Sequence, residues 1–200
     1  LTGVGGTENA IGFFGFAYYG NNQDAVKAIA AENRDGECVT PSNETVQNGS
    51  YNPLSRPLYT YANVEALRAK PQIVGFVDYM MNEGLAAVME EVGYSLPPEG
   101  TYAANLEAMS LALTTDYSVF EGDILADGSS TVFPLATAVA EEFQAVAPGV
   151  RASIGLAGTG GGFSVFCPGE TDMSNASRAI RTSEAATCET TGTQFVEFLL

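Results

Sequence analysis

The amino-acid sequence predicts an α/β fold, with a mainly parallel sheet and helices on both faces. Residues 123–200 alternate strand-like runs with helical patterns, as such sheets require. One apolar stripe at helical spacing follows Pro71. The length of 200 residues and the hydrophobic content of 46% supply enough apolar material for one compact domain, although two small domains would also fit.

The elements expected in the first fifty residues are short. Residues 10–19, AIGFFGFAYY, mix aromatic residues with glycine and predict a buried strand that enters a tight turn or a short helix. Residues 25–32, AVKAIAAE, are ambiguous between strand and helix. A short helix is expected next, with Ser42 or Asn43 as its N-cap and Gly49 as its stop.

The segment LYTYAN, residues 58–63, has the composition of a strand and precedes the clearest helix of the sequence. That helix is expected to begin at Pro71 and to end at Gly93. Its apolar stripe consists of Ile73, Val77, Met80, Met81, Leu85, Val88, Met89 and Val92. A second helix is expected within residues 97–113, and residues 114–122 then have the character of a connector.

The rest of the chain repeats a unit of strand, polar loop and helix, and closes with a strand. The segments are residues 123–148, 150–169, 171–189 and 193–200. The loops after the first three strands are DGSSTVF at 127–133, GTGGGF at 158–163 and SNASR at 174–178. Because ligands gather beyond the carboxyl ends of parallel strands, we expect all three loops at one edge of the sheet.

These loops carry donors that suit a tetrahedral oxyanion. The first amides of a helix have no partner within the helix, glycine lets an anion approach them closely, and hydroxyls add further donors. The candidate donors are Ser130 and Thr131 with nearby amides, Thr159 with the amides of Gly160 and Gly161, and Asn175, Ser177 and Arg178. Taken singly, a glycine-rich turn more often serves packing, and a lone arginine is more often a solvated surface charge. The occurrence of three such loops together favours an anion-binding site over these alternatives.

Composition excludes several classes of function. Eight Lys and Arg stand against 24 Asp and Glu, and the formal charge of -16 repels nucleic acid and anionic membranes. Any bound anion must therefore be held by local hydrogen bonds. The sequence contains no histidine, which removes the commonest general base and metal ligand. We expect no enzyme activity, no metal and no cofactor.

Known phosphate-binding and membrane-directing patterns are also missing from the sequence. The glycines lack the following Lys-Ser or Lys-Thr of a nucleotide P-loop and the spacing of a dinucleotide-binding motif. No apolar run of about 18 residues occurs, and no basic-then-apolar leader opens the sequence. We therefore expect no insertion into a membrane.

The three cysteines, Cys38, Cys167 and Cys188, match no zinc-binding spacing. A disulfide between Cys167 and Cys188 is one interpretation, which would add roughly 3 kcal/mol of stability and indicate a location outside the reducing cytosol. The other interpretation is that all three cysteines are buried thiols.

Four segments resemble the PstS-like family of periplasmic substrate-binding proteins, the phosphate-binding component of bacterial ABC phosphate importers. They are NAIGFFGFAYYGNNQDAVKAIA, CVTPSNETVQNGSYNPLSRPLYTYAN, DGSSTVFPLATAVAEEFQ and GTGGGFSVFCPGETDMSNASRAI. Residues 1–110 resemble the C-terminal segment of the family, residues 123–200 resemble its N-terminal segment, and residues 111–122 connect them. The resemblance implies a single three-layer lobe of a type II periplasmic binding protein over residues 1–200, circularly permuted and without the second lobe.

The resemblance also implies a ligand and a set of ligand contacts. Inorganic phosphate would be bound by Ser130, Thr131, Val132 and Phe133, largely through their backbone, by Thr159 and Gly160, and by Asn175, Ser177 and Arg178. Ser177 stands where some relatives have an acceptor aspartate, which weakens the expectation of discrimination against sulfate by proton donation. Half of a site is expected to bind phosphate weakly.

Further expectations come from the family. The protein would be periplasmic or extracellular, with an ABC transporter permease as a partner. Cysteines flank the same region in relatives, which supports the Cys167–Cys188 disulfide. Cys38 is left over: it could pair with another chain or stay a buried thiol, and the buried thiol is the favoured interpretation. The alternative function is a structural or self-associating module, paired with a second lobe or another copy through hinge segments such as AIGFFGF and TQFVEFLL.

Overall fold

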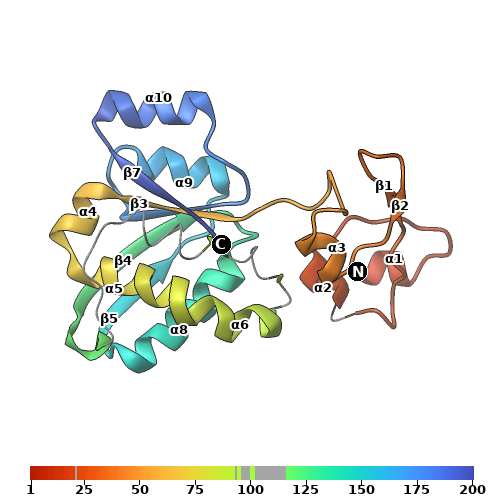
Figure 1. The fold of residues 1–200 in the computed structure, drawn as a ribbon, viewed down its shortest axis with the longest axis horizontal. Helices are drawn as coiled ribbons and strands as arrows, with labels where there is room; N and C mark the ends of the chain where they lie inside the picture. Colours follow the sequence, from red (N-terminus) through yellow and green to blue (C-terminus); the bar gives the residue numbers. More distant parts are fainter. Residues whose placement is uncertain (21, 93, 96–99, 102–115) are drawn as a thin grey trace. The chain divides into compact units, whose positions relative to one another are not determined.

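The computed structural model describes residues 1–20, 22–92, 94–95, 100–101 and 116–200 (Figure 1). The chain divides into two compact units, Leu1–Arg56 with Met89–Pro98, and Pro57–Val88 with Glu99–Leu200. The single lobe expected over residues 1–200 stays a prediction. Most of the helix expected within residues 97–113 lies outside the described residues.

The first unit contains short elements around a two-stranded antiparallel hairpin. Its elements are α1 (Thr2–Gly5), α2 (Phe16–Gly20), β1 (Ala31–Glu32), β2 (Cys38–Val39) and α3 (Asn43–Gln47). The expected cap of α3 is confirmed, because the Ser42 hydroxyl accepts a hydrogen bond from the Thr45 amide at 3.1 Å. Gly49 follows with a φ of 73°, the left-handed conformation expected at a helix stop.

Two expectations for this unit are wrong. Residues 10–15 form no strand, and Ile11 and Phe13 are 79% and 80% exposed. The described part of the unit places no strand beside this segment, so apolar character alone does not produce a strand. Cys38, expected to be a buried thiol, is free and exposed, because β2 is a short strand whose neighbouring Val39 takes the more buried side.

The second unit contains a five-stranded sheet in the order β5-β4-β6-β3-β7. The strands are β3 (Tyr59–Asn63), β4 (Glu121–Gly128), β5 (Gly149–Ile154), β6 (Met173–Ala176) and β7 (Phe195–Leu199). β4 runs parallel to β5 and β6, whereas β3 runs antiparallel to β6 and β7. The predicted α/β class is confirmed, with a mixed sheet whose parallel half carries the three polar loops.

Helices cover both faces of this sheet, α9 and α10 on one face and α5 and α8 on the other (Figure 1). The helical segments are α4 (Val64–Ala69), α5 (Pro71–Tyr79), the π-helix η1 (Met80–Gly84), α6 (Leu85–Val92), the 3-10 helix η2 (Tyr117–Val119), α8 (Phe133–Val146), α9 (Thr159–Phe166) and α10 (Thr182–Thr191). The predicted helix after Pro71 is thus confirmed, interrupted by one π-helical turn.

The apolar stripe of that helix is buried from Ile73 to Met89, as its spacing predicted, and Val92 at its end is half-buried. Ile73 and Val77 are fully buried, and Phe76 stacks edge-on against Phe143 of α8 at a ring distance of 5.3 Å. On the other face of the sheet, Tyr61 of β3 packs edge-on against Phe163 of α9 at 5.0 Å. The core of the unit therefore lies in two layers, one on each side of the sheet.

The predicted disulfide is confirmed. Cys167 at the end of α9 is bonded to Cys188 of α10, and both are fully buried beside Tyr61, Phe163 and Phe166. The bridge joins the two helices that cover this face.

Gly162 of α9 explains part of the glycine-rich loop. A Cβ atom at this position would lie 2.6 Å from the Cα of Gly128 and 2.8 Å from the Oγ of Ser174. Only a residue without a side chain lets α9 pack this closely on β4 and β6. Gly160, in contrast, has no atom nearer than 3.9 Å to such a Cβ, so packing does not require a glycine there.

We predict that Gly162→Ala lowers the free energy of unfolding by about 1–3 kcal/mol, because the added methyl group overpacks the contact with β4. Gly160→Ala in the same helix turn is the matched control and should change it by less than about 1 kcal/mol. Urea denaturation followed by circular dichroism measures both. Equal effects of the two substitutions would contradict the packing explanation.

Asp78 of α5 is a buried acid at the junction with the π-helix. Its carboxylate accepts hydrogen bonds from the Tyr117 hydroxyl at 3.2 Å and from the Asn82 side-chain amide at 2.5 Å. Burial raises the pKa of this carboxyl above its ordinary value of 3.8, and the charge of Glu83 adds to the rise.

Because folding raises the pKa of Asp78, the folded state binds the proton more tightly than the unfolded state. The stability that this residue contributes is therefore fully present below its ordinary pKa and is lost as the pH rises through the folded value. We predict that the wild type loses stability relative to Asp78→Asn as the pH rises above the ordinary pKa of 3.8. Urea denaturation across this range tests the sign, and a constant difference would refute it.

Candidate anion-binding site

The three polar loops lie at one edge of the sheet, as predicted, because β4 runs parallel to β5 on one side and to β6 on the other. Two backbone hydrogen bonds join the loops. The Gly158 amide donates to the Gly128 carbonyl at 2.7 Å, and the Ser129 amide donates to the Asn175 carbonyl at 2.8 Å. The ends of β4, β5 and β6 thus form one connected rim.

The loop between β4 and α8 is organised by Ser129, a residue that the sequence analysis did not select. Its carbonyl accepts from the amides of Val132 and Phe133 at 3.1 and 3.0 Å, and its hydroxyl accepts from the Thr131 amide at 3.2 Å. Ser130 is exposed, whereas the Val132 side chain is fully buried. The Val132 side chain therefore cannot contact a ligand, and the backbone contact predicted for this residue stays a prediction.

Asp127 is a second residue that the sequence analysis missed. Its Oδ1 accepts from the Gly128 amide at 2.6 Å and from the Ala157 amide at 2.9 Å, so it fixes the β5–α9 loop to the end of β4. An aspartate directly before the Gly-Ser turn was the available signal, because such side chains commonly bond to nearby backbone amides.

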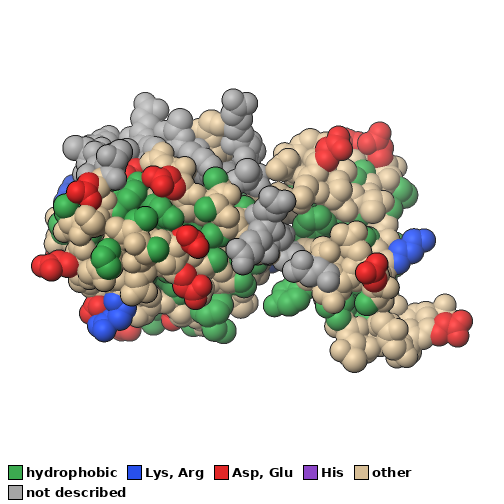
Figure 2. Space-filling model, turned by 90° about the horizontal axis from the view of Figure 1, so that it is seen from below, with side chains coloured by type: hydrophobic (Ala, Val, Ile, Leu, Met, Phe, Trp, Pro, Cys, Tyr) green, Lys and Arg blue, Asp and Glu red, His purple; other side chains and the backbone are tan. Residues whose placement is uncertain are grey.

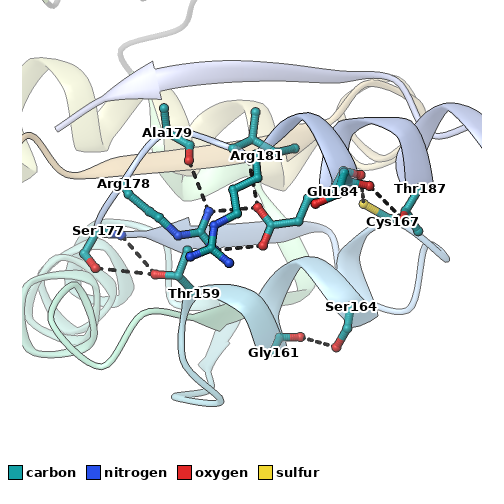
Figure 3. A network of polar contacts seen from close by, with 12 residues as sticks. Thr159, Gly161, Ser164, Cys167, Ser177, Arg178, Ala179, Arg181, Glu184 and Thr187 are labelled. Atoms are coloured by element: carbon teal, nitrogen blue, oxygen red, sulfur yellow. Dashed lines mark hydrogen bonds and ion pairs between the residues drawn. The ribbon is translucent and has the colours of Figure 1, made fainter.

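Thr159 and Ser177 lie together, as predicted. Thr159 is the first residue of α9, after Gly158 with a φ of 83°. Its hydroxyl accepts from the Ser177 amide at 3.2 Å, and the two hydroxyl oxygens are 3.4 Å apart (Figure 3). Both residues are half-buried, and the neighbouring Gly160 is exposed. The start of α9 is therefore accessible beside two hydroxyls.

Asn175 differs from the simple expectation of a residue on the rim. It lies in β6 and is only 2% exposed, next to Gly128 of β4 and Thr60 of β3 in the sheet register. Within the described part of the chain, its Nδ2 and the Thr60 hydroxyl have no hydrogen-bond partner. A buried donor of this kind is costly unless something else satisfies it.

Arg178 lies beside Thr159 but is paired with a carboxylate (Figure 3). Its two terminal nitrogens donate to the two oxygens of Glu184 at 2.8 and 2.7 Å. Arg178 lowers the pKa of the Glu184 carboxyl, which is therefore ionised at neutral pH. The arginine predicted as a donor to the anion is thus part of an ion pair, and Glu184 is the third residue that the sequence analysis missed.

The chain as a whole is acidic. On the face shown in Figure 2, acidic side chains are spread over the surface and few basic ones lie between them. Among the described residues, Lys70, Arg151 and Arg178 are in ion pairs with Asp172, Asp123 and Glu184. An anion at the rim would therefore have to be held by hydrogen bonds at short range, as expected from the net charge of -16.

The described residues contain no group of three or more Cys, Asp and Glu side chains that could hold a metal ion. In the same ranges, no helix has both the length and the apolar character that crossing a bilayer requires.

A cavity of about 710 Å³ lies at the opposite edge of the sheet. Its lining includes Asn63, Lys70, Thr171, Asp172 and Gln194, at the end of β3 and the starts of β6 and β7. It is remote from the three loops, so size alone does not locate the candidate site.

In a three-layer α/β unit, the polar loops at the carboxyl ends of parallel strands are the usual place for a bound ligand. Residues 103–200 match the model of the PBP superfamily domain. The resemblance to phosphate-binding proteins is confirmed by the relatives that follow.

The chain is 46% identical to Protein SphX of Synechococcus elongatus over 130 residues, which are 64% of this chain and 37% of that protein. It is 34% identical to the phosphate-binding protein PstS of Staphylococcus aureus over 108 residues, 54% of this chain and 32% of the relative. The chain therefore spans about a third of the length of these curated relatives.

The fold is similar to that of a phosphate-binding protein of a phosphate ABC transporter from Streptococcus pneumoniae. The TM-score is 0.67 at 18% identity, over 99% of this chain and 68% of that chain. This similarity confirms the fold predicted for the chain.

We predict that replacing Cys167 and Cys188 with serine lowers the free energy of unfolding by about 3 kcal/mol, the amount expected for a closed loop of this size. The residues are 21 positions apart and fully buried. Urea denaturation of the double variant measures the loss. Cys38→Ser is the matched control, since Cys38 is free and exposed, and a comparable loss there would contradict the prediction.

Proposed function

We propose that the chain binds inorganic phosphate, as part of the solute-binding protein of an ABC transporter. The observation that carries this proposal is the contact between Thr159 and Ser177, where the start of α9 meets the loop after β6. Two hydroxyls and the first amides of a helix form a cluster of donors at the shared edge of the sheet. Such a cluster can replace the water around a small oxyanion.

Each loop has a distinct part in this proposal. Thr159 and Gly160 offer a hydroxyl and helix-start amides, and the exposed Gly160 leaves room for close approach. The β4–α8 loop contributes Ser130 and Thr131. The amides of Val132 and Phe133 at the start of α8 donate to the Ser129 carbonyl, so they would bind the anion by sharing or exchanging that hydrogen bond. The loop after β6 contributes Ser177 and Arg178, while the buried Asn175 offers an amide that lacks a partner among the described residues.

The names of the relatives support the choice of phosphate over other oxyanions. Several finer statements belong to the same proposal: a circularly permuted order, a second lobe supplied from outside this chain, an ABC transporter permease as partner, and a periplasmic or extracellular location. The Cys167–Cys188 disulfide is consistent with an oxidising compartment.

The affinity of the isolated chain for phosphate should be weaker than micromolar. A cleft closed by two lobes excludes water and strengthens each charge-assisted hydrogen bond, whereas an open rim leaves the anion partly hydrated. Calorimetric titration with phosphate measures the affinity. A micromolar or tighter value would show that the described loops form a complete site by themselves.

We predict that Thr159→Val weakens phosphate binding by about tenfold, because it removes one hydroxyl at nearly constant side-chain volume. Thr187→Val is the matched control: Thr187 lies on α10 and its hydroxyl donates to the Ser183 carbonyl within that helix. Titration followed by amide NMR should show shifts confined to the three loops. Shifts spread over the exposed surface, or equal affinities of the two variants, would overturn the site.

The alternative, a self-associating module, is favoured by a different observation. In the first unit, Ile11, Phe13 and Tyr18 are 79%, 80% and 64% exposed, which is unusual for apolar side chains so close in sequence. Sedimentation across a dilution series tests it. A monomer at every concentration would remove this alternative, and concentration-dependent mass with no phosphate-induced shifts would favour it.

A further inference from the structure

Glu184 has more hydrogen-bond donors around it than an ordinary surface carboxylate. One oxygen accepts from Arg178 at 2.7 Å, and the other accepts from Arg178 at 2.8 Å and from the Arg181 amide at 2.9 Å (Figure 3). The side chain is only 16% exposed. From these contacts we propose that Glu184 is a positioning residue of the phosphate site, acting through Arg178. The inference rests on the proposed function.

The position of Glu184 is fixed from two sides. Cys188 lies one turn further along α10, and its disulfide to Cys167 ties that helix to the end of α9. At the other end of α9, a Cβ atom on Gly160 would lie 3.9 Å from Oε1 of Glu184. The carboxylate is therefore held next to the first turn of α9, where Thr159 and the helix-start amides lie.

The ion pair orders Arg178 without using all of its donors. A guanidinium has five N–H groups in one plane. Two of them bind Glu184, and a third donates to the Ala179 carbonyl at 3.2 Å. The Nε–H and one terminal N–H are left for a ligand, and the side chain is still 28% exposed. Fixing a long side chain before the ligand arrives lowers the entropy cost of binding.

Glu184 also has an effect that opposes phosphate binding. It is ionised, because Arg178 lowers its pKa, and a negative charge beside the site repels an anion. Removing the charge would therefore strengthen phosphate binding if Glu184 acted only by repulsion. It would weaken binding if the main role of Glu184 is to hold Arg178, so the direction of the change decides between the two roles.

The test is a double-mutant cycle on the full chain, with inorganic phosphate as the probe. Glu184→Gln keeps the size of the side chain and removes its charge. We expect it to weaken phosphate binding by about tenfold. In an Arg178→Ala background, the same substitution should leave the affinity unchanged or raise it, because only the repulsion is left to remove. Glu189→Gln, an exposed residue of the same helix, is the matched control and should have little effect.

A second measurement needs no ligand. The terminal N–H signals of Arg178 that bind Glu184 should be resolved and protected from exchange in the wild type, and lost in Glu184→Gln. Circular dichroism confirms that each variant is folded.

The outcomes separate this inference from the proposed function. If the wild type binds phosphate and Glu184→Gln binds it equally or more tightly, the positioning role is wrong and the phosphate site stands. Equal weakening in both backgrounds would also overturn the role, since it would show a purely structural effect. A wild type that binds no phosphate overturns the proposed function and the inference together.

Discussion

The close packing of α9 against the ends of β4 and β6 is the constraint on which the rest of the site depends. It requires a bare backbone at Gly162, where any side chain would meet Gly128 and Ser174. Once α9 lies in this place, its first residue, Thr159, reaches the loop after β6 and bonds to Ser177. The disulfide to Cys188 then fixes α10 on the same face. The packing of this face and the position of the hydroxyl donors thus both follow from the placement of α9 on the sheet.

The second condition is that β4 pairs in parallel with both β5 and β6. The three loops that follow these strands therefore lie at one edge of the sheet. The backbone hydrogen bonds between Gly158 and Gly128 and between Ser129 and Asn175 show how closely the reversals approach. The antiparallel strands β3 and β7 complete the sheet beside β6. Tyr61 of β3 holds the segment after β6 in place, because its hydroxyl accepts a hydrogen bond from the Ile180 amide at 2.9 Å.

Much of this arrangement could be predicted from the sequence, because the alternation of strand, loop and helix after residue 121 is strong and local. The same is true of the helix after Pro71 and of the Ser42 cap. Contacts between distant side chains could not be predicted in this way. Nothing in the spacing of Arg178 and Glu184 shows that they pair, and Asp127 and Ser129 act through backbone amides that become neighbours only in the folded sheet. The exposed Ile11 and Phe13 show the converse, because an apolar composition does not by itself mean that a segment is buried.

The central claim is that donors from three loops converge on one small oxyanion. A crystal structure of the chain grown with phosphate tests it most directly. The account predicts density for a tetrahedral ion within hydrogen-bonding distance of both Thr159 and Ser177, close to the exposed Gly160. Well-ordered loops with no ion at that rim, or an ion bound at another edge of the sheet, would contradict it.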